Sequence, residues 1–172
     1  DETLQHAGVI TGLGGYAGHS HKYKKKGGSG YLFRTSTVQD FSGVTGACLL
    51  VKTAVYDEMH GLDEQFAVAF NDVDFCLRVR DAGYRIAWTP YAELIHYESK
   101  SRGGDEKDPV KAARFAAEQQ RLYTIHGKEN ILDDPYYNPN LTRDREDFSE
   151  SDDLRRLKEG RVTVRFRGGT LQ

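Results

Sequence analysis

Two aspartates, Asp72 and Asp74, stand one residue apart in the stretch FNDVDFCLRVRDAGYRI, residues 70–86. Carboxylates at this spacing can hold one metal ion from a loop or a strand end, but on a helix residues two apart point to nearly opposite sides. They can instead cap a helix, because with Asn71 they place oxygen acceptors and negative charge where free N–H groups need partners. A carboxylate at a helix start can also take a proton from a substrate hydroxyl. Metal binding, capping and general-base catalysis are therefore three open interpretations of this pair.

A second candidate is His96, which ends the apolar stretch ELIH. Its imidazole can bind a divalent metal. Lys100 and Arg102 follow closely, and cations on a loop after a metal ligand suit a diphosphate, whose oxygens take charge-assisted hydrogen bonds. The alternative is a structural histidine followed by a solvated polar loop. The pair His19 and His21 is a weaker metal candidate, because it lies in a glycine-rich polar region.

The composition limits the classes of function. A chain of 172 residues is about the size of one domain, and its net charge of −2 argues against a nucleic-acid partner. No apolar run approaches the roughly 20 residues of a membrane helix, and no signal peptide is visible. Cys48 and Cys76 lie in apolar runs and are expected to be buried in a reducing compartment. We therefore expect a cytoplasmic protein, with a peripheral position at the inner face of the membrane as an alternative.

The elements that must position these residues follow from periodicity and from start and stop signals. Helices are expected at residues 53–60, capped by Thr53, at 71–82, ended by Gly83, and at 108–126, started by Asp108-Pro109. Strands are expected at residues 45–52, 84–89, 92–97 and 161–167. Beyond Leu132 the chain turns polar and shows no core-forming pattern, so residues 133–172 are expected to form an extended polar arm.

One ordered series of short motifs resembles a known family. Between Thr45 and Gly103 the chain reads TGA with an apolar run, then GLDE, FNDVDFCLR, AGYR, TPYAELIHYES and SRG. This series resembles the C-terminal, acceptor-side half of a family 2 glycosyltransferase with the GT-A fold. The flanking LQHAGV and DPYYNPNL extend the resemblance to about residue 148. It implies an α/β, partial GT-A (Rossmann-like) fold over residues 1–132, with a mixed sheet flanked by helices.

The resemblance also implies roles for residues at the matching positions. Asp72 becomes the general base, supported by Asp74 and by Asn71, which stands where the family more often has glutamate. His96 matches a metal-ligand position, since Pro90 to His96 has the family's spacing. The remaining implied positions are Lys100 and Arg102 for the donor diphosphate and Thr45, Gly46 and Trp88 in the acceptor- and donor-side loop.

The implied reaction is inverting transfer of a sugar from a nucleotide-sugar donor to a glycan or lipid-linked acceptor, as in bacterial cell-envelope polysaccharide synthesis. A Mg²⁺ or Mn²⁺ ion would stabilise the departing diphosphate. The family's nucleotide-binding half, which carries most metal ligands, does not precede Asp1. We therefore expect the chain to be part of a larger enzyme, with the missing half as its partner, and to be inactive alone. The alternatives are a non-catalytic glycan- or nucleotide-binding module of GT-A ancestry and a piece that only docks on another domain.

Overall fold

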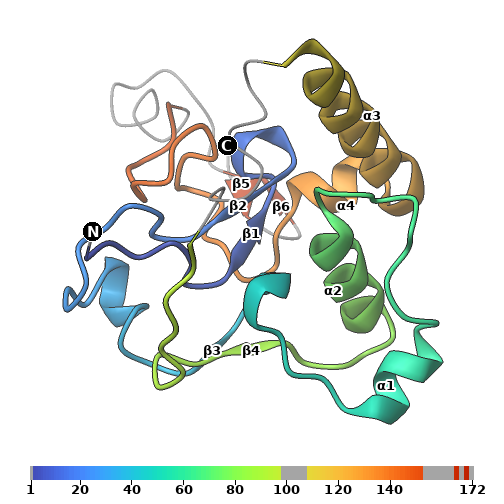
Figure 1. Cartoon of the computed structure of the whole chain (residues 1–172). Helices are drawn as coiled ribbons and strands as arrows, with labels where there is room; N and C mark the ends of the chain where they lie inside the picture. The colour runs from blue at the N-terminus through green and yellow to red at the C-terminus, as the bar shows by residue number, and fades with distance from the viewer. Residues whose placement is uncertain (1, 98–107, 153–164, 167–168, 171–172) are drawn as a thin grey trace.

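The structure is a computed structural model that describes residues 2–97, 108–152, 165–166 and 169–170. Helices and short strands are interspersed along the chain (Figure 1), which agrees with the expected α/β class. The α-helices are α1 (Thr53–Glu58), α2 (Asn71–Asp81), α3 (Pro109–His126) and α4 (Lys128–Leu132). The 3₁₀ helices are η1 (Leu13–Gly15), η2 (Tyr31–Phe33) and η3 (Gly46–Cys48). The strands are β1 (Val9–Thr11), β2 (Ala17–His19), β3 (Gln39–Asp40), β4 (Ala87–Trp88), β5 (Arg165–Phe166) and β6 (Gly169–Thr170).

The strands of the described residues pair in twos, and each pair is antiparallel: β1 with β2, β3 with β4, and β5 with β6. The connection from β1 to β2 runs through η1 and needs left-handed backbone at Gly12 (φ 78°) and Gly15 (φ 90°), which glycine adopts without steric cost. The single mixed sheet that we expected is not present among these residues. The structure therefore agrees with the expected α/β class but does not show the expected sheet architecture.

Two of the expected strands are wrong. Residues 45–52 contain the 3₁₀ helix η3, which Thr45 caps by accepting a hydrogen bond from the Ala47 amide at 3.3 Å. Residues 92–97 form no strand, and the strand expected at 84–89 shrinks to β4. A strand needs a neighbour for its backbone groups, and the described part of the chain offers these segments none beyond the pairing of β4 with β3. Of the strand expected at 161–167, only β5 lies within the described residues.

Helix α2 is confirmed, with Gly83 (φ 88°) following its end. Its buried side chains lie on more than one face. Val73 and Leu77 pack in a cluster with Ile131 of α4, whereas Phe75, Cys76 and Val79 pack in a cluster with Val55 of α1. Helix α2 thus lies between α4 and α1, as Figure 1 also shows, and anchors the residues at its own N-terminus.

Helix α3 is confirmed with its start and stop signals. The Asp108 side chain accepts a hydrogen bond from the Val110 amide at 2.9 Å, and Gly127 ends the helix. Along this helix Leu122 is fully buried, whereas Phe115 and Ile125 are 37% and 43% exposed. For α1, the expected cap is wrong. Thr53 is already helical, and the N-cap residue Lys52 makes no side-chain cap.

Beyond Leu132 the chain contributes to the core, contrary to the expectation of no core-forming pattern. Tyr137, Leu141 and Phe148 of this segment pack in one hydrophobic cluster with Ile10 of β1, Leu13 of η1 and Phe41. Asp134 ties the segment to β1, because its fully buried carboxylate accepts a hydrogen bond from the Thr11 amide at 2.7 Å. Tyr137, Leu141 and Phe148 are four and seven residues apart, a spacing that a helix would place on one face, but the segment forms turns, bends and isolated bridges instead of a helix.

The two cysteines differ. Cys76 is buried, as expected, and its burial raises the pKa of the thiol to about 11. Cys48, expected to be buried, is exposed because η3 places it at the surface. Among the described residues, no helix combines the length and the apolar character that crossing a bilayer requires.

Candidate functional site

The candidate site is built around the first turn of α2, which the chain enters through an unusual backbone conformation. Phe70 has φ 63° and ψ 3°, in the left-handed region that a bulky residue rarely adopts. Its carbonyl accepts a hydrogen bond from the Asp74 amide at 2.8 Å. The side chain of Asn71 accepts from the Asp72 amide at 2.7 Å, and that of Asp72 accepts from the Val73 amide at 2.9 Å. Both side chains therefore accept from N–H groups in the first turn of α2, as the capping interpretation expects, although the N-cap residue itself, Phe70, makes no side-chain cap.

Asp72 makes a second contact that capping does not require. Its Oδ2 accepts a hydrogen bond from the Gly46 amide at 2.7 Å, across 26 residues of sequence. A side chain at position 46 would meet the Asp72 Cβ at 3.3 Å, so glycine permits this close approach. The structure thus brings Gly46 to Asp72, and Thr45 precedes the contact directly. The carboxylate is half-buried, with each oxygen oriented by one backbone N–H.

His6 is a residue near this loop that the sequence did not single out. Its Nε2 accepts hydrogen bonds from the amides of Thr45 and Gly8, both at 3.3 Å. Burial and the nearby His19 ring lower the pKa of His6 to about 3, so the imidazole is neutral near pH 7. A neutral ring can accept from the Thr45 amide, which helps to hold the loop against Asp72. No spacing signal links residues 6 and 45, so only the fold reveals this contact.

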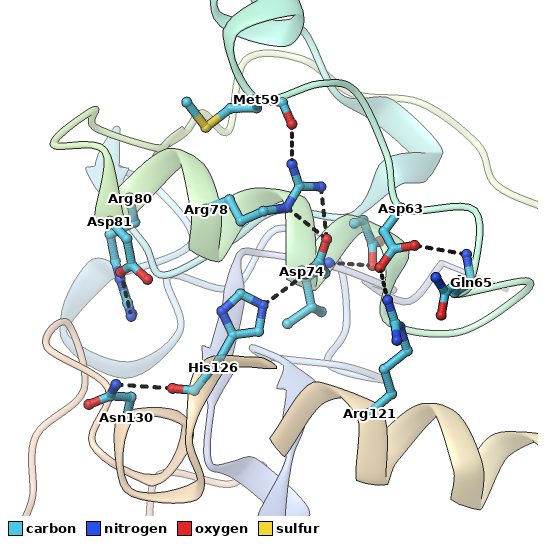
Figure 2. A network of polar contacts seen from close by, with 12 residues as sticks. Met59, Asp63, Gln65, Asp74, Arg78, Arg80, Asp81, Arg121, His126 and Asn130 are labelled. Atoms are coloured by element: carbon cyan, nitrogen blue, oxygen red, sulfur yellow. Dashed lines mark hydrogen bonds and ion pairs between the residues drawn. The ribbon is translucent and has the colours of Figure 1, made fainter. Parts of the chain in front are cut away.

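Asp74 has different partners from Asp72 and lies in a buried polar network (Figure 2). Its Oδ1 is 2.8 Å from Nε2 of His126, at the end of α3. Its Oδ2 accepts from Nε and Nη2 of Arg78 at 2.9 and 2.8 Å, and Arg78 in turn donates to the carbonyls of Met59 and Gly61. One carboxylate therefore joins α2, α3 and the turn after α1.

This network also determines the direction in which the pKa of Asp74 is shifted. Burial alone would raise the pKa of its carboxyl group, but the hydrogen bonds from His126 and Arg78 outweigh that effect and hold the pKa below its usual value. The side chain is 1% exposed and both oxygens are engaged. Both oxygens of Asp74 are therefore engaged by His126 and Arg78 instead of being free to share an ion with Asp72, and these contacts join α2 to α3.

Glu118 positions the segment that leads into Phe70. Its buried carboxylate accepts hydrogen bonds from the amides of Ala69 at 2.7 Å and Val68 at 3.3 Å. Arg114, one turn earlier on α3, lies 3.8 Å away as an ion-pair partner. Helix α3 thus holds the entry to α2 by a second, independent contact.

Replacement of Glu118 by alanine is expected to lower the free energy of unfolding by about 1–3 kcal/mol, because two partly buried amides would lose their acceptor. Urea denaturation followed by circular dichroism measures the change. Gln120→Ala is the matched control, since this exposed residue of α3 uses only its backbone carbonyl in a contact to Thr124. Equal stability of the two variants would contradict the proposed role of Glu118.

The metal candidate His96 lies on an exposed segment, where its Nδ1 is 2.7 Å from the side-chain oxygen of Gln5. No group of three or more His, Cys, Asp or Glu side chains in the described residues is arranged to hold a metal ion. The described donor set thus does not form a divalent-metal site by itself. Of the weaker candidate pair, His19 has its Nδ1 3.0 Å from the Gln5 carbonyl, and His21 is buried and uses both ring nitrogens, toward the Ser20 hydroxyl and the Tyr31 amide.

The remaining candidate residues have different positions. Trp88 is half-buried in β4, where its ring meets Phe41 edge-to-face with centroids 6.5 Å apart, and no contact of the described residues ties it to Asp72. Lys100 and Arg102 lie outside the described residues. The structure therefore brings together Thr45, Gly46, Asn71 and Asp72 of the expected set.

A cavity of about 240 Å³ opens beside the entry to α2. Aromatic rings form part of its wall, with Phe70 5.3 Å from Phe115 and 6.3 Å from Tyr16 between ring centroids. Asp144 and Glu146 add carboxylates, and burial raises the pKa of Glu146. Asp72 does not line this cavity, although Phe70 lies only two residues before it.

Curated proteins with related sequences support a chemical context for this site. The chain is 35% identical over 141 residues to the O-antigen biosynthesis protein RfbC of Myxococcus xanthus, a match that covers 81% of the chain and 11% of that protein. It is 32% identical over 80 residues to an N-acetylglucosaminyl-diphospho-decaprenol L-rhamnosyltransferase of Mycobacterium tuberculosis, covering 46% of the chain and 24% of the enzyme. These matches support a relationship to glycosyltransferases.

A third relative, the uncharacterized protein y4gI of Sinorhizobium fredii, is 48% identical over 149 residues. That match covers 86% of the chain but 16% of the relative, so the chain spans less than a quarter of the length of each of these three proteins. No protein-family model matches the chain. No solved structure matches it either.

Proposed function

We propose that this chain is the acceptor-side part of an inverting, family 2-like glycosyltransferase with the GT-A fold, and that Asp72 is its general base. The contact between Asp72 and the Gly46 amide carries the proposal. It orients a half-buried carboxylate at a helix start without pairing it to a cation among the described residues, which leaves lone pairs to accept a proton. The names of two relatives, which state O-antigen biosynthesis and rhamnosyl transfer, agree with this chemistry.

In the proposed reaction, an acceptor hydroxyl attacks the anomeric carbon of a nucleotide sugar. The new oxygen–carbon bond forms as the bond to the diphosphate breaks, so the configuration at that carbon inverts. Asp72 takes the hydroxyl proton, and the nucleoside diphosphate leaves with the bonding electron pair. Asn71 supports the base by accepting from the Asp72 amide, which fixes the turn.

Most residues of the proposed donor-binding site lie outside the described residues or in another part of a longer polypeptide. We propose Lys100 and Arg102 as cations that balance the charge of the leaving diphosphate. His96 is the proposed contribution of this chain to a Mg²⁺ or Mn²⁺ site whose other ligands come from the nucleotide-binding half of a longer polypeptide. The acceptor is proposed to be a glycan or a lipid-linked sugar.

The test is an assay of nucleoside diphosphate release by the protein expressed from its complete gene, with a panel of UDP-, GDP- and dTDP-sugars and with glycan and lipid-linked acceptors. We expect acceptor-dependent release by the complete protein and none by residues 1–172 alone. Turnover by these residues alone would contradict the need for a second half. Glycan or nucleotide binding by the complete protein without turnover would favour a binding module instead.

A further inference from the structure

Gln5 makes a side-chain contact to the candidate metal ligand His96, across 91 residues of sequence. The side-chain oxygen of Gln5 lies 2.7 Å from Nδ1 of His96. An amide oxygen only accepts hydrogen bonds, so Nδ1 is the donor in this contact and carries a proton. In a neutral imidazole the other nitrogen, Nε2, then keeps its lone pair. The contact thus selects the tautomer of His96 in which Nε2 can bind a cation.

This arrangement is the one that histidine ligands have in protein metal sites. A ligating histidine usually donates its second ring N–H to an oxygen acceptor, which fixes the orientation and the tautomer of the ring. No hydrogen bond among the described residues engages Nε2 of His96, and the side chain is exposed. The imidazole therefore fits one ligand position of a divalent metal, which is the position proposed for it above.

The backbone of Gln5 is held in place by the rest of the fold. The amide of the preceding residue, Leu4, donates to the carbonyl of Lys24 at 2.7 Å. The carbonyl of Gln5 itself lies 3.0 Å from Nδ1 of His19. Residues 92–97, by contrast, form neither helix nor strand. Gln5 therefore offers a fixed acceptor to a histidine whose own segment lacks regular structure.

The residue after Gln5 contacts the loop of the candidate base. Nε2 of His6 accepts a hydrogen bond from the amide of Thr45 at 3.3 Å. The next residue of that loop, Gly46, donates to Asp72 at 2.7 Å. Two adjacent residues thus contact the candidate metal ligand on one side and the loop that orients the candidate base on the other.

We propose that Gln5 is a positioning residue, which orients the ring of His96 and fixes its tautomer so that Nε2 is free to bind the divalent metal of the proposed site. This role rests on the proposed function, since it takes His96 as a metal ligand. Gln5 itself touches neither the metal nor the substrate and acts only through His96. Loss of such a partner usually weakens metal binding by about 10- to 100-fold.

Mn²⁺ binding by the protein expressed from its complete gene tests the proposal without any turnover. Electron paramagnetic resonance measures the free ion during a titration and so gives Kd. Gln5→Leu removes the acceptor at similar size and is expected to raise Kd by about 10- to 100-fold. Gln5→Glu keeps an oxygen acceptor and is expected to keep Kd close to that of the wild-type protein, because carboxylates also fill this role.

Two further variants show whether Gln5 acts through His96. His96→Ala is expected to weaken Mn²⁺ binding, and the double variant Gln5→Leu/His96→Ala should bind no more weakly than His96→Ala alone, because the two residues act as one unit. Gln120→Leu is the matched control, since this exposed residue of α3 uses only its backbone carbonyl in a contact to Thr124. It is expected to leave Kd unchanged.

The pattern of losses separates this inference from the proposed function. An unchanged Kd in Gln5→Leu, together with weak binding by His96→Ala, would overturn the role of Gln5 and leave the proposed sugar transfer intact. Losses that add in the double variant would also overturn the role of Gln5. No Mn²⁺ binding by the wild-type protein, or an unchanged Kd in His96→Ala, would overturn both the proposed metal position of His96 and the role of Gln5.

Discussion

Replacing Asp72 with asparagine is expected to lower the rate of sugar transfer by the complete protein roughly 10²- to 10⁴-fold, the usual contribution of a positioned general base. Asparagine keeps the size of the side chain but cannot accept the hydroxyl proton. One of its two contacts, to the Gly46 or the Val73 amide, also loses its acceptor, because the amide nitrogen only donates. Donor binding should persist, so the loss should appear in kcat. Steady-state kinetics measures kcat and KM separately and so distinguishes a loss of turnover from a loss of donor binding.

The matched control for Asp72→Asn is Asn71→Ala, which removes the acceptor of the Asp72 amide but no carboxylate. If Asp72 only caps α2, both variants should lose a similar, small amount of stability and keep near wild-type transfer. If Asp72 is the base, Asp72→Asn should lose far more transfer activity than Asn71→Ala. Wild-type turnover in a folded Asp72→Asn protein would remove the base assignment.

Replacing Asp74 with alanine is expected to lower the free energy of unfolding by about 3 kcal/mol, because removal of one partner leaves buried charge and hydrogen-bond donors uncompensated. His126 is 5% exposed and would lose its carboxylate partner, and Arg78 would keep only its two carbonyl acceptors. The lower end of the usual range applies because the Arg78 side chain is 27% exposed. Urea denaturation of the chain measures the loss.

Asp81→Ala is the control for Asp74→Ala, since Asp81 is on the same helix and its side chain is 60% exposed beside Arg80. Its ion pair at the surface should contribute little. The pKa of Asp74 is held below its ordinary value of 3.8. Its contribution is therefore complete above that pH and is lost as the pH falls through the lowered pKa. The difference in stability between the Asp74→Ala and Asp81→Ala variants should accordingly disappear in acid. Equal losses of stability by the two variants at neutral pH would contradict the role of the network.

The helices were predictable from the sequence because their signals are local. Asp108-Pro109 and Gly127 mark the ends of α3, and Gly83 marks the end of α2, each through backbone preferences of one or two residues. The strands were not predictable to the same extent, because a strand depends on a partner that local sequence does not specify. The run around Leu50 has a strand's pattern, yet the described residues supply no partner for it.

The contacts of the candidate site were likewise predictable from the sequence only in part. That Asn71 and Asp72 accept from amides at the helix start follows from their residue types, and the ordered motifs singled out both Gly46 and Asp72, which are in contact. The pairing of Asp74 with His126, 52 residues away, has no local signal. Nor does the contact of Glu118 with the amide of Ala69, 49 residues earlier. Long-range polar contacts of this kind depend on how the helices pack, which residue types alone do not determine.

The backbone of Phe70 has a consequence for protein engineering. A residue with a side chain in the left-handed conformation costs roughly 1–2 kcal/mol, and glycine would remove that cost. Glycine would also remove the ring that contacts Phe115 and Tyr16, with centroids 5.3 and 6.3 Å away. The two effects oppose each other at a residue only two positions before Asp72. A screen for thermostable variants should therefore gain little at position 70, whereas a screen for altered activity has reason to begin there.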